Sequence, residues 1–416
     1  MTGVSTMDAK SSPNRKIVLL FSVSFLTVLA LSMQSPTFPL FAAESGATLI
    51  QIGMIVSIGF MVRFISRVPI GLFSDRFGRK RLFSFGAICV MSSFLVLYLS
   101  VSLLHITASQ VFTALAFTTV FPIGMTVAAE MSQDSSGTEF AAFASASSLA
   151  GLAAPLVCSA LLLSMSIRET YLIAGILGSA GVAASLLLPK GHTIRKSFEV
   201  RASLQNVLAN REVQLVSTVQ VFTALSDIAI STYFPLRASS EIGLSPSTIA
   251  LLMSFYPLGM TLIRFLLPKI FERMTALRLL IAGLAVYMIS MITIPLATEA
   301  FLLAIFIGIA GVAHGVIWPS ASLHLSHSVD RRDLGLANAA YGGVGDLVGI
   351  AAPVALSSII ASMGYGALYY TTFLFDLVGV VVMVLLTQRV LQLGSGRAAD
   401  HTAIFMSSSA KITLPS

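Results

Sequence analysis

Residues Gly151-Leu152-Ala153-Ala154-Pro155 recur 198 positions later (353 − 155) as Gly349-Ile350-Ala351-Ala352-Pro353. Further matches at offsets of 196 to 198 are Phe38-Pro39-Leu40 and Phe234-Pro235-Leu236, Arg67 and Arg264, Gly86 and Gly283, Gly137 and Gly335, and Ser159 and Ser357. Chance matches between small or apolar residues are common, but one nearly constant offset over several segments is not. The sequence therefore predicts a chain built from two related halves.

The composition places this chain in a membrane. Of its 416 residues, 56% are hydrophobic and only 10% are charged, and the mean hydropathy is +0.90. A soluble domain is about 45–50% apolar and roughly 25% charged, so this chain cannot cover a globular surface with polar side chains. That excludes a soluble enzyme, a disordered protein and a nucleic-acid-binding module, although the pI is about 9.6.

The apolar residues form continuous runs rather than alternating patterns, which favours transmembrane helices over a β-barrel. A transmembrane helix uses about 20 apolar residues. The sequence predicts an all-α polytopic membrane protein with twelve transmembrane helices in two pseudo-symmetric six-helix bundles. The predicted helices cover approximately residues 17–40, 49–73, 82–104, 106–131, 139–164, 167–189, 213–236, 247–270, 276–297, 300–326, 334–362 and 366–391.

Polar segments set the predicted domain boundaries. The longest polar joint, 190–212, is predicted as a cytoplasmic linker between bundles at 17–189 and 213–393. Residues 1–16 form a short N-terminal tail. Residues 394–416 form a Gly-, Ser- and Ala-rich tail that is predicted to be disordered.

The basic residues predict the orientation. With both termini in the cytoplasm, 20 of the 25 Lys and Arg residues fall on the cytoplasmic side, that is, all except Arg63, Arg67, Arg168, Arg237 and Arg264. Such a bias is typical of the cytoplasmic loops of integral membrane proteins. We therefore expect a multi-pass protein of the cell membrane whose net charge of +7 reflects anionic membrane lipids rather than nucleic acid.

A glycine- and arginine-rich joint follows the second predicted helix. It reads Gly71-Leu72-Phe73-Ser74-Asp75-Arg76-Phe77-Gly78-Arg79-Lys80-Arg81 and resembles the signature loop of the major facilitator superfamily, Gly-x-Leu-[Ser/Ala]-Asp-Arg-x-Gly-Arg-[Arg/Lys]. Gly71 is expected to permit close helix contact, and Gly78 to permit the turn. The resemblance implies a conformational latch between the halves on the cytoplasmic side, formed by Gly71, Asp75, Arg76, Gly78, Arg79 and Lys80.

The resemblance also implies a secondary transporter that works by alternating access, similar to the branch of drug and small-organic-molecule antiporters. Two positions depart from that branch. Gln110 stands where many proton-coupled members carry an Arg, and Ala154-Pro155 stands where drug–proton antiporters carry Gly-Pro. The sequence therefore does not imply proton coupling through position 110.

Arginines within the predicted helices are candidate site residues, because a charge inside a bilayer costs about 2.5–3.5 kcal/mol on insertion scales. Arg63 and Arg67 lie four residues apart on one helix face. With Arg264, the repeat partner of Arg67, they form either an anion site or structural pairs near the cytoplasmic gate. Arg63 is the sharper candidate because it lies deeper and its repeat partner, Met260, is neutral.

Three acidic residues also lie within predicted helices. Asp227 in the seventh helix is the first candidate for a substrate or proton site, and structural pairing is an equal alternative. Asp346 is expected to pair with Arg63 or Arg67 across the halves. Asp376 in the twelfth helix is expected to be structural, since that helix packs peripherally in the family.

Three further polar or aromatic residues complete the candidate substrate and proton site. His314 in the tenth helix is a candidate because histidine exchanges its proton near neutral pH, although a hydrogen-bonded structural histidine is commoner. Trp318 either stacks on a substrate or packs beside a proline. Gln34 lies beside Pro36 in the first helix, where Pro36 and Pro39 predict a break or bend.

These features favour a secondary active transporter that moves a small organic molecule outward in exchange for protons, functions as a monomer and needs no cofactor. The alternative is a carrier of a small inorganic or organic anion bound by the intramembrane arginines. A membrane enzyme is a remote alternative, because no phosphate-binding loop, metal-ligand spacing or catalytic set is present in the sequence. A channel or receptor would not require the duplicated loop.

Overall fold

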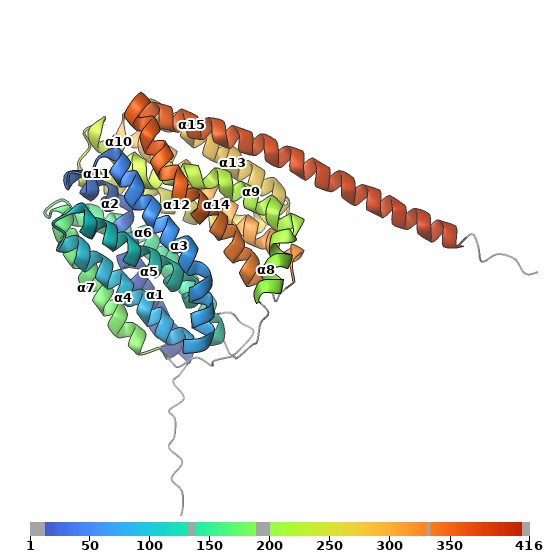
Figure 1. The fold of residues 1–416 in the computed structure, drawn as a ribbon, viewed down its shortest axis with the longest axis horizontal. Helices are drawn as coiled ribbons and strands as arrows, with labels where there is room; N and C mark the ends of the chain where they lie inside the picture. The colour runs from blue at the N-terminus through green and yellow to red at the C-terminus, as the bar shows by residue number, and fades with distance from the viewer. Residues whose placement is uncertain (1–12, 132–137, 189–199, 331–332, 410–416) are drawn as a thin grey trace, which may run out of the picture.

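The computed structural model describes the backbone of residues 13–131, 138–188, 200–330 and 333–409, and side chains between 17 and 388 in these ranges except at 75, 129–130 and 200–203. Within these ranges the chain is helical and contains no strand, in agreement with the predicted fold class. Figure 1 shows the first half of the chain, blue to green, beside the second half, yellow-green to red.

Seven helices make up the first half, and the first two of them form a single crossing. They are α1 (Pro13–Ser32), α2 (Gln34–Glu44), α3 (Leu49–Phe77), α4 (Arg79–Tyr98), α5 (Leu103–Met131), α6 (Thr138–Leu161) and α7 (Ile167–Leu186).

The second half begins with a short helix, α8 (Val200–Ala209). The crossings that follow contain one π-helix, η1, and one 3₁₀ turn, η2. In order they are α9 (Arg211–Ile228), η1 (Ala229–Tyr233), α10 (Phe234–Ser240), α11 (Pro246–Met253), α12 (Phe255–Phe271), α13 (Ala276–Thr293), η2 (Ile294–Leu296), α14 (Ala300–Ser328) and α15 (Leu334–Ser409).

The number of crossings follows from the length of α15. Eleven segments of the described chain are long and apolar enough to cross a membrane, and the last, Leu334–Gln388, has 55 residues. A straight helix of that length would measure about 80 Å, more than twice the ~30 Å hydrocarbon core. The segment breaks at Gly364, where φ is 83° and ψ is 172°, and the chain turns back on itself (Figure 1). The described chain therefore makes twelve crossings.

Local sequence signals fix where the helices begin. Thr48 and Gln51 form a capping box at the start of α3, and Ser166 and Glu169 form another at the start of α7. Gly78 separates α3 from α4 with a φ of 90°, a conformation that side-chain-bearing residues rarely adopt. Because these boundaries fix where each crossing begins and ends, they also fix how deep in the membrane the charged residues at its middle lie.

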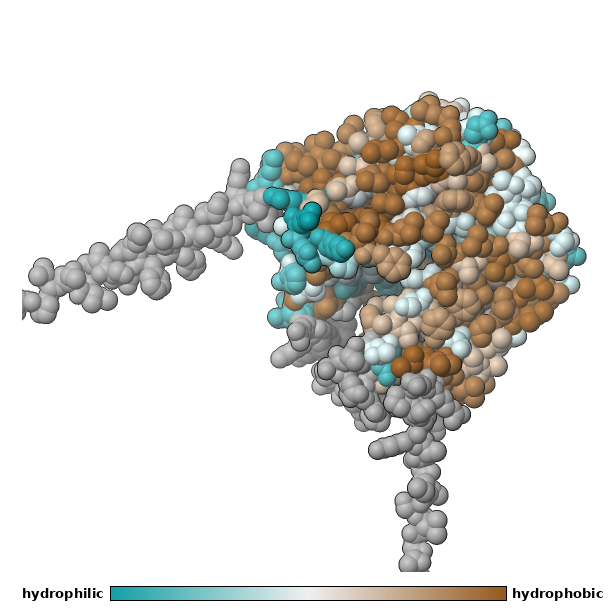
Figure 2. Space-filling model, turned by 180° about the vertical axis from the view of Figure 1, so that it is seen from behind, coloured by the Kyte–Doolittle hydropathy of each residue, from teal (hydrophilic) through white to brown (hydrophobic). Residues whose placement is uncertain are grey.

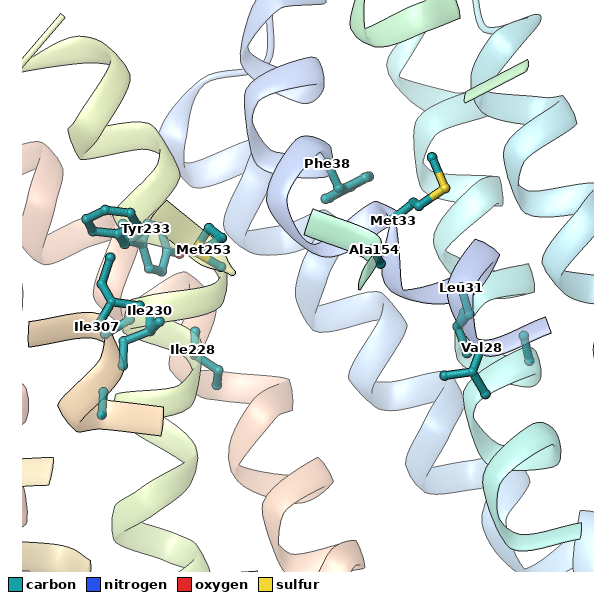
Figure 3. Packing of buried hydrophobic residues seen from close by; sticks show 14 of the residues in the cluster. Val28, Leu31, Met33, Phe38, Ala154, Ile228, Ile230, Tyr233, Met253 and Ile307 are labelled. Atoms are coloured by element: carbon teal, nitrogen blue, oxygen red, sulfur yellow. The ribbon is translucent and has the colours of Figure 1, made fainter. Parts of the chain in front are cut away.

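The first crossing of each half is irregular at the same repeat position. α1 ends at Ser32 and α2 begins at Gln34, which confirms the break that the prolines predict. In the second half α9 passes into η1 at Ala229, 196 residues after Met33. Figure 3 shows Met33 at the first break, and Ile230 and Tyr233 at the second. Such π segments occur frequently at functional sites.

The two halves contact each other along α3 and α15 and, in addition, toward one end of the bundle. We call the end that carries Gly78 the linker end, and the opposite end, which carries Gly364, the far end. Toward the far end, α2 contacts η1 and α10, and the Ser247 hydroxyl of α11 donates to the Ser159 carbonyl of α6 at 2.8 Å. Gly53 of α3 lies so close to α15 that an added Cβ would be 2.8 Å from the Pro353 carbonyl oxygen. Figure 2 shows the molecule hollowed between the halves toward the linker end.

The structure describes the predicted linker and tails only in part. Residues 190–199 of the predicted linker lie outside the described part of the chain, as do residues 1–12 of the N-terminal tail, whereas 200–209 form α8, which packs on α9 and α15. The predicted disordered tail at 394–416 is helical up to Ser409. Its sequence contains no proline before Pro415, and the helix continues through Gly394 and Gly396, which disfavour helix interiors.

Candidate functional site

Two arginines of the first half and one aspartate of the second meet where the halves contact. Arg63 lies at the middle of α3, and its Nη2 forms an ion pair with Asp346 Oδ1 at 2.9 Å. Arg67, one turn further on, donates from Nε to Asp346 Oδ2 at 2.8 Å and also contacts it through Nη2. The expected pairing of Asp346 with one of these arginines is confirmed, and the structure shows it with both.

Aromatic rings hold the Arg63 guanidinium at mid-depth. It lies over the ring of Phe117, 4.0 Å from the centroid, and over that of Phe60, at 4.8 Å. Its Nε is buried and has no hydrogen-bond partner among the described residues. Arg63 and Gln110 both line a cavity of about 90 Å³ between α3 and α5. The guanidinium is therefore positioned but not fully paired.

The arginine cluster carries an excess of positive charge. Two guanidinium groups share one carboxylate, and the Asp346 side chain is only 1% exposed, whereas Arg63 and Arg67 are 23% and 21% exposed. An intramembrane charge is costly unless it is paired. The exposed faces of these arginines can therefore bind an anion.

A second polar cluster surrounds Asp227 at the middle of the seventh crossing. The Tyr256 hydroxyl donates to Asp227 Oδ1 at 2.7 Å, and the Tyr287 hydroxyl donates to the same oxygen. His314 Nδ1 lies 3.2 Å from that oxygen. The four side chains come from α9, α12, α13 and α14, so this cluster joins four helices of one half.

The contacts of Asp227 are one-sided. All three neighbours converge on Oδ1, and no described residue donates to Oδ2. The Asp227 and His314 side chains are 27% and 25% exposed, although both lie at mid-depth. The carboxylate is thus fixed through one oxygen and accessible through the other, which suits the binding of a proton or a ligand donor.

The other candidates lie outside these two clusters. Arg264 forms no ion pair within the described residues, and its Nε is buried without a hydrogen-bond partner there. The Trp318 ring is 40% exposed and lies edge-on to Tyr341, with ring centroids 5.9 Å apart. Gln34 is buried with Nε2 unpartnered among the described residues. Asp376 is fully buried and accepts a hydrogen bond from Ser226 at 2.7 Å.

The structure corrects one role assigned in the glycine- and arginine-rich joint. A Cβ added to Gly71 would meet nothing within 4 Å, so Gly71 makes no close helix contact, whereas Gly78 does occupy the expected turn. Lys80 donates to the Leu186 carbonyl of α7 at 2.6 Å, and Arg76 lies 5.6 Å from the Phe77 ring centroid. Both contacts stay within the first half. The Asp75 side chain lies outside the described part of the chain. Arg79 is not free, since it interacts with a neighbouring group.

The uncharged partners of the charged residues are not among the residues predicted from the sequence. Tyr256 and Tyr287 bind Asp227, and Phe117 packs on Arg63. A search for charges alone does not find such residues. The signal was the depth of the tyrosines, because tyrosine in membrane proteins is enriched at the interfaces rather than at mid-depth.

The fold defines a class of protein: two related six-helix halves are an architecture found in many membrane transporters. The sequence model of the Major Facilitator Superfamily matches residues 20–215 and 216–406 of this chain. The chain belongs to this family.

Similar proteins agree on the fold. An uncharacterized MFS-type transporter from Methanocaldococcus jannaschii is 21% identical over 310 residues, covering 72% of this chain and 79% of the relative. The crystal structure of the nucleoside transporter NupG matches with a TM-score of 0.74 and 13% identity, covering 89% of this chain and 98% of that one. A POT family transporter in complex with 5-aminolevulinic acid matches with a TM-score of 0.74 and 12% identity, over 90% and 96% of the two chains.

Proposed function

We propose that this membrane transporter is a secondary active antiporter that exports a small organic molecule in exchange for protons, with Asp227 and His314 as the proton site. The observation that supports it is the partly exposed pair of Asp227 Oδ1 and His314 Nδ1, 3.2 Å apart at mid-depth. A histidine changes its charge between pH 5 and 8. A proton gained or lost here changes contacts to four helices at once, which links protonation to the packing of the second half.

In the proposed mechanism the substrate crosses the membrane when the two halves change from one arrangement to the other. The halves contact each other toward the far end and are hollowed toward the linker end, so the central groups are reached from one side. The reverse state requires the far-end contacts to open and the linker ends to close. We place the joint at 71–80 at that closure, as the latch of the family, and we place the linker end in the cytoplasm of a monomer in the cell membrane.

The proton role is tested with purified protein in proteoliposomes that contain a pH-sensitive dye. Candidate organics, beginning with nucleosides and 5-aminolevulinic acid because structural neighbours are described with them, are added under an imposed pH gradient. Asp227→Asn is expected to reduce substrate-dependent proton movement at least tenfold. Asp376→Asn, which changes a fully buried aspartate, serves as the matched control and is expected to retain it. Full proton movement in Asp227→Asn would contradict the proposal.

Carriage of a small anion is a second candidate function, because two guanidinium groups share the single Asp346 carboxylate. Arg63→Ala is then expected to abolish uptake of the transported anion while Arg67 still pairs with Asp346. Uptake of labelled nitrate, phosphate and small carboxylates by proteoliposomes measures this. Unchanged uptake of every transported anion in Arg63→Ala would exclude the anion function.

A further inference from the structure

The repeat relates the two clusters to each other. At an offset of 197, Pro122 inside α5 corresponds to Pro319 inside α14. The same offset pairs Phe117, which covers Arg63, with His314, which contacts Asp227. The two halves therefore present the same framework with opposite chemistry: a cation against an aromatic ring in one, and a carboxylate against an imidazole in the other.

Each half keeps one charge that it does not neutralise. In the first half Arg63 and Arg67 share Asp346, which belongs to the second half. In the second half the two tyrosine hydroxyls that hold Asp227 are neutral donors, and its Oδ2 has no donor among the described residues. The two arginines thus form a positive pole on the first half, and the free Oδ2 of Asp227 forms a negative pole on the second.

The two poles are accessible at the same depth. Arg63 stands at the middle of α3, and Asp227 at the middle of the seventh crossing, Arg211–Ser240. Both side chains are about one quarter exposed, at 23% and 27%. Because unpaired charges inside a membrane are costly, a ligand that neutralises both poles binds more favourably than one that neutralises either alone.

We propose that the substrate is dipolar, with a carboxylate that binds Arg63 of the first half and an ammonium group that binds Asp227 of the second. This assignment rests on the proposed transport function of the same site. It merges the two substrate classes that the sequence leaves as alternatives, since the acidic and basic sites lie in different halves. Such a ligand bridges the two halves, because Arg63 lies in one and Asp227 in the other.

A series of ω-amino acids tests this proposal directly. Glycine, β-alanine, 4-aminobutyrate, 5-aminopentanoate and 6-aminohexanoate carry both charges at increasing separation. The n-alkylamine and the n-alkanoate with the same number of carbon atoms are the matched single-charge controls. Binding to the full-length protein in detergent is measured by ligand-induced thermal stabilisation at about pH 8, where histidine side chains are largely neutral.

We expect at least one ω-amino acid to bind tenfold or more tightly than both of its single-charge controls. The best chain length then reports the separation of the two poles. Less than tenfold discrimination at every length, including no binding at all, would overturn the proposal.

Substitutions locate the two poles. In Arg63→Gln the best ω-amino acid is expected to bind no more tightly than its alkylamine, and in Asp227→Asn no more tightly than its alkanoate. Asp376→Asn is expected to keep the full discrimination. Undiminished discrimination in Arg63→Gln or Asp227→Asn would refute the assignment. The series on the unmodified protein stands even if a variant does not fold.

Binding without a gradient separates this inference from the proposed function. If Asp227-dependent proton movement is found but dipolar discrimination is not, only the dipolar assignment fails. If dipolar ligands bind but drive no proton movement, the proposed coupling fails and the substrate class stands.

Discussion

At the residue scale, the hydroxyl groups around Asp227 are expected to contribute both stability and function. Tyr287 is fully buried and donates to Asp227 Oδ1. A hydrogen bond to a charged group contributes about 1.5–3 kcal/mol. Tyr287→Phe is therefore expected to lower the melting temperature and to reduce transport. Thermal unfolding in detergent and flux in proteoliposomes measure the two effects.

Tyr369→Phe is the matched control for this substitution. Tyr369 is also fully buried, but its hydroxyl has no hydrogen-bond partner among the described residues. Removing an unpaired buried polar group is neutral or stabilising, so the melting temperature is expected to stay the same or rise. Equal losses in the two variants would show that the hydroxyl of Tyr287 has no special contribution.

The same residues show how far the sequence predicts the site. The ion pair between α3 and α15 is predictable, because Arg63, Arg67 and Asp346 are costly charges that need partners inside a membrane. The tyrosines on Asp227 are not, because their hydroxyls are inexpensive to bury and their pairing depends on how α12 and α13 pack. Arg264, expected beside the other arginines from the repeat alone, forms no ion pair within the described residues.

At the scale of elements, the turn between α3 and α4 depends on one of its two glycines. Gly78 has a φ of 90°, and forcing a side-chain-bearing residue into such a region costs about 1–3 kcal/mol. Gly78→Ala is expected to lower the melting temperature. Gly71→Ala, inside α3 with free space around the added methyl group, is expected to raise it slightly, because alanine is favoured over glycine in helices by about 0.5–1 kcal/mol.

Helix boundaries and breaks are predictable to different degrees. The break at Met33 follows from nearby prolines, which remove backbone donors and distort a helix locally. The π-helix Ala229–Tyr233 also has a proline nearby, Pro235, two residues after its end, whereas the packing between distant crossings is not encoded in any short sequence pattern. An example is the close contact of Gly345 in α15 with Gln220 in α9. These two helices belong to crossings that are distant in sequence.

At the scale of the whole molecule, the number of crossings is predictable and the conformational state is not. Twelve apolar runs determine twelve crossings because each must span the hydrocarbon core. Under the proposed alternating mechanism, one sequence is compatible with two arrangements of its halves. Which ends touch is a property of the structure, and here the contacts lie toward the far end.

A cross-link at the far end is expected to stop transport. Ser159 Oγ of α6 and Ser247 Oγ of α11 are 3.3 Å apart, so cysteines at these positions bring their sulfur atoms close to each other, although a disulfide requires an S–S distance of about 2.05 Å. In a background with Cys89→Ala and Cys158→Ala, the double variant Ser159→Cys/Ser247→Cys is expected to lose at least 90% of its flux on oxidation and to recover it on reduction. Each single cysteine variant should be insensitive to the oxidant. Undiminished flux with the disulfide formed would mean that α6 and α11 need not separate during transport.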